Sequence, residues 1–177
     1  MANIVFIATS LDGYIADKQG GLDWLHSVPN PENLDLGFVP LMERIDGLIM
    51  GRNTFETVIG FGVDWPYTKP VFVLSNTLTE VPAELADKVS IVSGELHDVV
   101  HSLNKRGYQD LYIDGGVTIQ NFLQQDLIDE LIITTIPVLL GDGAPLFGDL
   151  VSPLNFALSE SKTLLNAVVQ SHYVRQK

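Results

Sequence analysis

Short apolar runs alternate with amphipathic segments along this chain. Residues 2–9 form a nearly continuous apolar run with β-branched and aromatic members, and shorter runs cover 47–50, 71–74, 88–92 and 111–113. Runs of this length without polar alternation are typical of strands that are covered on both faces of a sheet. We therefore expect a set of buried, mostly parallel strands, of which 2–9 is the first.

Helical spacing of apolar residues follows several of these runs. It covers residues 38–45, 95–106 and 119–123, where apolar positions recur every three or four residues. Pro40 is awkward in the interior of such a helix, so we expect the first helix either to start late or to break near Gly37. The alternation of strands and helices predicts an α/β fold.

The C-terminal third of the chain has a different pattern. Residues 131–140 predict a long strand interrupted by Pro137, and residues 155–175 predict two strands joined near 164–166. Such a tail is most simply an antiparallel hairpin that closes one edge of a mixed sheet. With 177 residues and 46% apolar content, the chain suits one core, so we expect a single domain over 1–177.

Glycine and small polar residues stand at the ends of three predicted strands. Gly115 and Gly116 separate a strand from a helix, Gly51 does the same after 47–50, and Ser75 and Asn76 follow 71–74. Glycine lets a ligand approach the backbone closely, and a helix N-terminus offers free N–H groups to an anion. A lone glycine pair is more often a simple turn than a binding site. Three such ends at one sheet edge predict a site for a dinucleotide pyrophosphate.

Composition excludes several classes of function. Ten Lys and Arg against 22 Asp and Glu give a net charge of −12, which opposes binding to nucleic acid or anionic membranes. The absence of cysteine rules out disulfides, thiolate zinc sites and cysteine nucleophiles, and the four scattered histidines predict no metal site. Because the N-terminus lacks the pattern of a signal peptide, we expect a cytoplasmic protein. The glycine-bearing stretch 10–25 predicts a long functional loop that covers a pocket.

Four motifs in order resemble the dihydrofolate reductase-like fold, and within it the reductase domain of the bifunctional riboflavin-biosynthesis deaminase/reductase. They are SLDGYIA at 10–16, MGRNTFE at 50–56, DGG at 114–116, and LIDEL at 127–131 leading to PVLLGDGAPLF at 137–147. The resemblance covers nearly the whole chain, while the zinc-binding deaminase half is absent. It implies a stand-alone, three-layer αβα domain with a mixed, mostly parallel sheet, NADPH-dependent hydride transfer and a homodimer.

The resemblance also implies a coenzyme site, carried over position by position. The phosphates would lie on Gly51, Arg52, Asn53, Thr54, Gly115, Gly116, Val117, Thr118 and Ile119, the nicotinamide by Ala8, Ile15, Gly20, Gly21 and Leu22, and the adenosine half by Leu74, Ser75 and Asn76. A 2′-phosphate requires a cation and polar donors, which Arg52, Ser75 and Asn76 can supply. Val117 stands where dihydrofolate reductases often carry a basic residue. The sequence favours NADPH over NADH.

On the substrate side, dihydrofolate reductases place a buried carboxylate on the first long helix, facing the substrate. Asp35 falls closest to that position and Glu32 is second, although ordinary helix capping also explains a carboxylate there. We also expect Ser10, Asp12 and Thr134 near the substrate.

The substrate itself is less constrained by the sequence. Tyr14 stands where the riboflavin reductases often carry a basic residue, so a ribose phosphate would have one partner fewer. The leading hypothesis is a reductase of 5-amino-6-(5-phosphoribosylamino)uracil or a related heterocycle. The alternatives are a dihydrofolate or pterin reductase and a non-catalytic NADPH-binding module.

Overall fold

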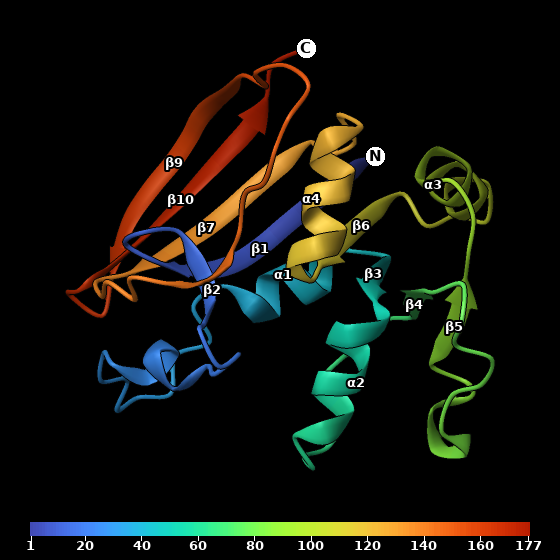
Figure 1. Cartoon of the computed structure of the whole chain (residues 1–177), viewed down its shortest axis with the longest axis horizontal. Coiled ribbons are helices and arrows are strands. Elements are labelled where there is room, and N and C mark those ends of the chain that lie inside the picture. Colours follow the sequence, from blue (N-terminus) through green and yellow to red (C-terminus); the bar gives the residue numbers. More distant parts are fainter.

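A computed structural model describes all residues, 1–177. Its eight-stranded sheet has the order β5-β4-β3-β6-β1-β7-β10-β9 (Figure 1). The strands are β1 (Ala2–Ser10), β3 (Gly47–Gly51), β4 (Val71–Leu74), β5 (Val89–Val92), β6 (Asp110–Asp114), β7 (Glu130–Ile136), β9 (Phe156–Leu164) and β10 (Val168–Arg175). Neighbours from β5 to β7 are parallel, whereas β10 pairs antiparallel with β7 and β9. The predicted α/β class, mixed sheet and C-terminal hairpin are confirmed.

Helices cover both faces of the parallel part of the sheet. They are α1 (Phe38–Arg44), α2 (Arg52–Gly60), α3 (Leu96–Lys105) and α4 (Gly116–Gln124), with short 3₁₀ turns η1 (Asp23–His26) and η2 (Ala83–Leu85). One core cluster packs α1 and α2 against the sheet, and a second packs α3 and α4 against the other face. Ile4 and Val5 are adjacent on β1, fully buried, and belong to opposite clusters, which explains the continuous apolar run. None of the helices is both long and apolar enough to span a membrane.

Helix α1 begins late, as Gly37 and Pro40 predict. Gly37 is the N-cap with φ 98°, in the left-handed region that glycine adopts readily. Pro40 lies in the first turn, where a missing backbone N–H costs no helical hydrogen bond. As a result, Glu32 and Asp35 precede the helix and do not lie on it.

The long strand predicted over 131–140 is shorter than expected. Strand β7 ends at Ile136, directly before Pro137, because proline cannot donate a ladder hydrogen bond. The chain that follows contains β8 (Gly143–Pro145), which pairs antiparallel with β2 (Tyr14–Asp17) of the first loop. This two-stranded unit, called the flap below, was not predicted; it joins two segments far apart in the sequence.

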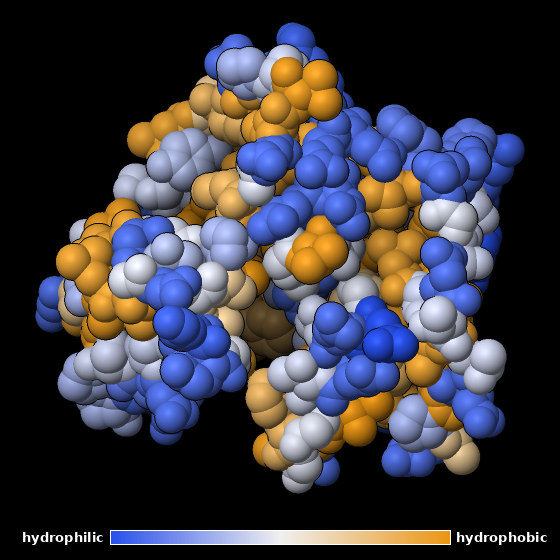
Figure 2. Space-filling view, viewed as in Figure 1, coloured by the Kyte–Doolittle hydropathy of each residue, from blue (hydrophilic) through white to orange (hydrophobic).

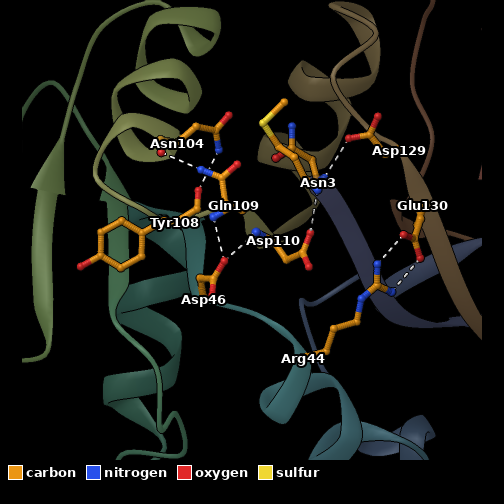
Figure 3. A network of polar contacts seen from close by, with 10 residues as sticks. Asn3, Arg44, Asp46, Asn104, Tyr108, Gln109, Asp110, Asp129 and Glu130 are labelled. Carbon is orange, nitrogen blue, oxygen red and sulfur yellow. Dashed lines mark hydrogen bonds and ion pairs between the residues drawn. The ribbon is translucent and has the colours of Figure 1, made fainter.

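Polar contacts tie the strands together at their amino ends (Figure 3). The Asp46 carboxylate accepts hydrogen bonds from the Gln109 and Asp110 amides at 2.7 and 2.9 Å, and these bonds lower its pKa. The Asn3 amide donates to Asp129 Oδ2 at 2.9 Å. The loops that bear glycine and small polar residues lie at the opposite, carboxyl ends of the strands, which is the edge where α/β sheets bind ligands.

Candidate active site

A polar pocket lies at the carboxyl ends of β3, β4 and β6, where α2 and α4 begin. It has a volume of about 320 Å³. Nine of the sequence-predicted coenzyme residues line it, together with Asn121; they are Gly51, Arg52, Asn53, Thr54, Leu74, Gly115, Gly116, Val117 and Thr118. The predicted Ile119 is buried and does not line it. We call it the phosphate pocket because its only charged side chain is the cation of Arg52.

The two glycine turns allow the starts of α2 and α4 to approach each other closely. Gly115 has φ 95°, which side-chain-bearing residues rarely adopt, and a Cβ there would collide with Thr54 Oγ1. A Cβ on Gly51 would lie 2.8 Å from Thr118 Oγ1. Neither helix has a side-chain cap at its N-terminus, so their first amides are open to an anion.

Arg52 extends from the phosphate pocket toward the end of β4. Its Nη1 donates to Thr77 Oγ1 at 3.1 Å, and its Nε lies 3.5 Å from Glu56 Oε1. Ser75 Oγ accepts from the amides of Thr77 and Leu78. The predicted partners Arg52 and Ser75 are therefore brought to one corner through Thr77, which sequence reasoning did not include.

A second pocket lies beside the carboxyl ends of β1 and β7, under the segment that carries η1. Its volume is about 270 Å³, near the lower end of the roughly 300–1,000 Å³ range of small-molecule sites. The residues that line it are Phe6, Ile7, Ala8, Leu25, His26, Val28, Asn30, Asp35, Leu36, Thr134, Ile136, Leu165 and Val168. Because most of these are hydrophobic, we call it the apolar pocket. Figure 2 shows the molecule hollowed between the η1 segment and α2, with apolar atoms at the bottom of the hollow.

The two pockets share the same edge of the sheet. The phosphate pocket lies at β3 and β6, and the apolar pocket at β1 and β7, where Ala8 and Thr134 are register partners. With the order β3-β6-β1-β7 and about 4.8 Å between strands, the outer strands are roughly 14 Å apart. An extended dinucleotide can bridge that distance.

Ser10 and Asp12, expected near the substrate, hold the flap in place. Ser10 is fully buried and its Oγ donates to Asp12 Oδ1 at 2.6 Å. Asp12 also accepts hydrogen bonds from the amides of Leu140 and Gly141, at 3.1 and 2.8 Å. The Ser10 hydroxyl, aided by these amides, lowers the pKa of Asp12 to about 2. Neither side chain lines either of the two pockets, whereas Thr134 lines the apolar pocket.

Other coenzyme predictions fall outside the two pockets. Gly20, Gly21 and Leu22 belong to a turn closed by Asp17, whose Oδ1 accepts the Gly21 amide at 2.7 Å. Asn76 is exposed beyond β4 and lines neither pocket. The contacts of these residues with a coenzyme stay predictions.

Ile15 and Ile119 are placed by packing. Ile15, on β2, contacts the glycine turn, since a Cβ on Gly116 would lie 2.6 Å from its Cδ1. Ile119 is fully buried in the core beneath α4, so its side chain does not reach the phosphate pocket. Helical spacing placed Ile119 on the apolar face of the predicted helix, and in the structure that face packs against the core.

The predicted carboxylates lie at the edge of the apolar pocket or outside it. Asp35 is exposed at the pocket rim, and its Oδ2 accepts the Val39 amide at 2.7 Å, which caps α1. Glu32 is exposed and does not line the pocket. The buried acid expected on the first helix is therefore not found there, because α1 begins only at Phe38.

Sequence reasoning overlooked Asp114 as an acid, although it quoted the DGG motif. Asp114 ends β6 and is half-buried directly before Gly115 of the phosphate pocket, and its Oδ1 accepts the Gly115 amide at 2.9 Å. Burial raises its pKa, and the neighbouring Tyr112 and Tyr67 hydroxyls offset only part of that rise. A carboxylate at a strand end directly before a glycine turn was the signal available in the sequence.

The doubly wound sheet with its paired pockets defines a protein of the dihydrofolate reductase-like class. The chain belongs to the RibD C-terminal domain family, whose model matches residues 3–170. Over its full length it is 64% identical to a protein from Shewanella sp. PV-4 whose given name assigns it to riboflavin biosynthesis, and the two structures agree with a TM-score of 0.98. It is also 34% identical to the uncharacterized protein YwjB of Bacillus subtilis, over 97% of both chains.

More distant structures share the fold. The deaminase/reductase of Thermotoga maritima matches at a TM-score of 0.74 and 14% identity, over 99% of this chain and 56% of its own. The dihydrofolate reductase of Enterococcus faecalis, complexed with NADP(H), matches at 0.66 and 20% identity, over 99% and 97%. The predicted resemblance to riboflavin-type reductase domains is confirmed.

Proposed function

We propose that this protein is an NADPH-dependent reductase of a nitrogen heterocycle, of the kind that riboflavin-type reductases reduce. The observation that carries the proposal is the pairing of a phosphate pocket with an apolar pocket at one sheet edge. Membership of the RibD C-terminal domain family and the NADP(H) complex of the Enterococcus relative support it.

The residues present suit a dinucleotide. The uncapped starts of α2 and α4 would receive the pyrophosphate, and Arg52 with Ser75 and Thr77 would receive a 2′-phosphate. Ala8 and Thr134 would then border the nicotinamide and the substrate. The bound coenzyme would supply the hydride, and the chain's own task is to orient both partners and deliver a proton.

Two carboxylates are candidates for the proton source. Asp35 lies at the rim of the apolar pocket, but it is exposed and already caps α1. Asp114 lies next to Gly115 of the phosphate pocket, and burial raises its pKa, which is the direction that a proton donor requires. The raised pKa favours Asp114 as the proton donor, whereas Asp35 is the carboxylate that lines the apolar pocket.

Calorimetric titration with NADPH and NADH tests the coenzyme. We expect NADPH to bind at least tenfold more tightly, and the Arg52→Gln variant to lose that preference while still binding NADH. Lys105→Gln, on α3 and outside the phosphate pocket, removes one positive charge elsewhere and should leave both affinities unchanged. Binding of neither coenzyme to folded protein would refute the reductase proposal.

The two alternative functions make different predictions in the same assay. A pterin reductase would oxidise NADPH with dihydropterin substrates and would require Asp35, the one carboxylate at the apolar pocket. A non-catalytic module would bind NADPH tightly and would not oxidise it with any of the acceptors. A screen of aminopyrimidines and pterins with the NADPH-loaded protein separates these cases.

We further propose that the protein is a homodimer through the exposed face of the C-terminal hairpin. Leu158 and Val169 are 59% and 43% exposed, and the strand register places them on the same face. Apolar groups grouped on a sheet face favour burial against a second copy. Sedimentation equilibrium should show a dimer that Leu158→Lys weakens and Val151→Lys does not. A monomer at micromolar concentration would refute this proposal.

A further inference from the structure

We propose that the apolar pocket receives a neutral heterocycle that carries no phosphate group. This inference rests on the proposed reductase function and narrows its substrate class. Nine of the thirteen lining residues are hydrophobic and none is Lys or Arg. A phosphate brings roughly −1.5 to −2 charges at neutral pH, and this pocket has no Lys or Arg to neutralise them; the exposed His26 is the one lining residue that can carry a positive charge.

The helix terminus beside the pocket does not replace a cation. The start of α1 is occupied by Asp35, whose carboxylate accepts the Val39 amide and whose backbone carbonyl accepts the Phe38 amide. The amides that could bind an anion are therefore engaged, and the Asp35 charge at the rim would repel a phosphate.

A neighbouring cavity does contain basic side chains, and two of them are already paired with a carboxylate. It adjoins the apolar pocket at Phe6 and contains Arg44, Lys162 and His172. Arg44 and His172 both contact the Glu130 carboxylate, at 2.5–2.8 and 2.7 Å. Together with Glu160 in the same lining, these carboxylates balance the positive charges.

The side chain of Gln170 separates the two cavities. Its Nε2 donates to the Leu36 carbonyl at 2.8 Å and to Thr134 Oγ1 at 2.9 Å, and the side chain is buried. Gln170 lines the neighbouring cavity, whereas Leu36 and Thr134 line the apolar pocket. A phosphate on a ligand in the apolar pocket would have to break these bonds in order to reach Lys162.

The remaining polar groups match a neutral ring. Thr134 accepts from Gln170, so its own hydroxyl proton can be donated to a ring carbonyl. Asp35 has one carboxylate oxygen left to accept from a ring N–H or an amino group. Asn30 is engaged at both side-chain atoms by Leu34. His26 is the fourth polar residue of the lining. The Thr134 donor and the Asp35 acceptor above an apolar floor suit a flat heterocycle with amide and amino edges.

The test compares two ligands that differ only in the phosphate. The first is 5-amino-6-(5-phosphoribosylamino)uracil, and the second is the same compound after removal of the phosphate. Each is titrated calorimetrically into the protein saturated with NADP⁺ and, separately, into the protein without coenzyme. We expect the dephosphorylated compound to bind at least tenfold more tightly in both series.

A pair of variants adds a charge to the chain. Val28→Lys places a cation in the pocket lining and should raise the affinity for the phosphorylated compound about tenfold, whereas Val151→Lys, which is 97% exposed outside the pocket, should not. Equal or tighter binding of the phosphorylated compound to the unmodified protein would overturn the inference. So would binding of neither compound. The titration without coenzyme tests the inference even if NADP⁺ does not bind. Failure of NADP⁺ to bind would refute the proposed reductase function and not this inference.

Discussion

The Asp12 carboxylate and the Gly141 amide form a 2.8 Å hydrogen bond across 129 residues of sequence. Asp12 stands at the start of the first loop, and Gly141 lies between β7 and β8. The bond therefore holds together the two segments that form the flap, at the edge of the sheet where both pockets open. Asp12 serves as a clamp for the flap.

Acid should weaken the flap through Asp12. Its pKa is lowered from 3.8 to about 2 in the folded protein, so its contribution to stability is fully present above about pH 4 and is lost as the pH falls toward 2. The difference in urea midpoint between the wild type and Asp12→Asn should therefore shrink from pH 4 to pH 2. Asp149→Asn is the control, because Asp149 is exposed, and its difference in urea midpoint from the wild type should not depend on pH. A constant difference for Asp12→Asn would contradict the assignment.

Alanine at Gly115 should damage both stability and coenzyme binding. The φ of 95° is unfavourable for alanine, and its Cβ would displace Thr54 from the phosphate pocket. We expect a loss of about 1–2 kcal/mol in the free energy of unfolding and at least tenfold weaker NADPH binding. Gly60→Ala, where a Cβ meets no atom within 4 Å, should change stability by less than about 0.5 kcal/mol. Urea denaturation and calorimetry measure both effects.

Asp114→Asn should separate stability from activity. Because burial raises the pKa of Asp114, ionisation disfavours the folded state as the pH rises above the ordinary value near 4. The variant should therefore be at least as stable as the wild type at pH 7, with kcat reduced by about 100-fold or more if Asp114 supplies the proton.

The matched variant for that experiment is Asp35→Asn. Asp35 lies at the rim of the apolar pocket, where it would bind the ring without donating the proton. The Asp35→Asn variant should therefore raise KM more than it lowers kcat. Steady-state rates across pH for both variants decide between the carboxylates. A large loss of kcat in Asp35→Asn alone would restore the prediction made from the sequence.

Glu130 should be important for stability at the amino end of β7. Its carboxylate binds Arg44 through two hydrogen bonds and His172 through a third, and the Arg44 guanidinium in particular lowers its pKa. Glu130→Gln should cost about 1–2 kcal/mol at pH 7, measured by urea denaturation. Because the folded-state pKa of Glu130 is lowered from 4.5, this difference should be fully present above that pH and should diminish as the pH falls through the lowered pKa. Glu43→Gln, which is exposed on α1 next to Arg44, should have little effect.

The sequence by itself determined the fold class and the phosphate pocket. Buried parallel strands appear as continuous apolar runs because both of their faces are covered, and helices appear through their spacing. The residues of the phosphate pocket follow directly after strands, so local patterns such as Gly51-Arg52 and Gly115-Gly116 identified them. Pro40 and Gly37 also indicated that the first helix starts late or breaks near Gly37, and α1 starts late.

Only the tertiary structure decided the flap, the apolar pocket and the state of the carboxylates. The flap pairs segments about 130 residues apart, and the apolar pocket gathers side chains from β1, the η1 segment, β7 and the hairpin. An apolar residue that lines a pocket has the same local pattern as one that fills a core. Likewise, the exposure of Asp35 and the burial of Asp114 depend on neighbours distant in sequence, because desolvation is a property of the packed environment.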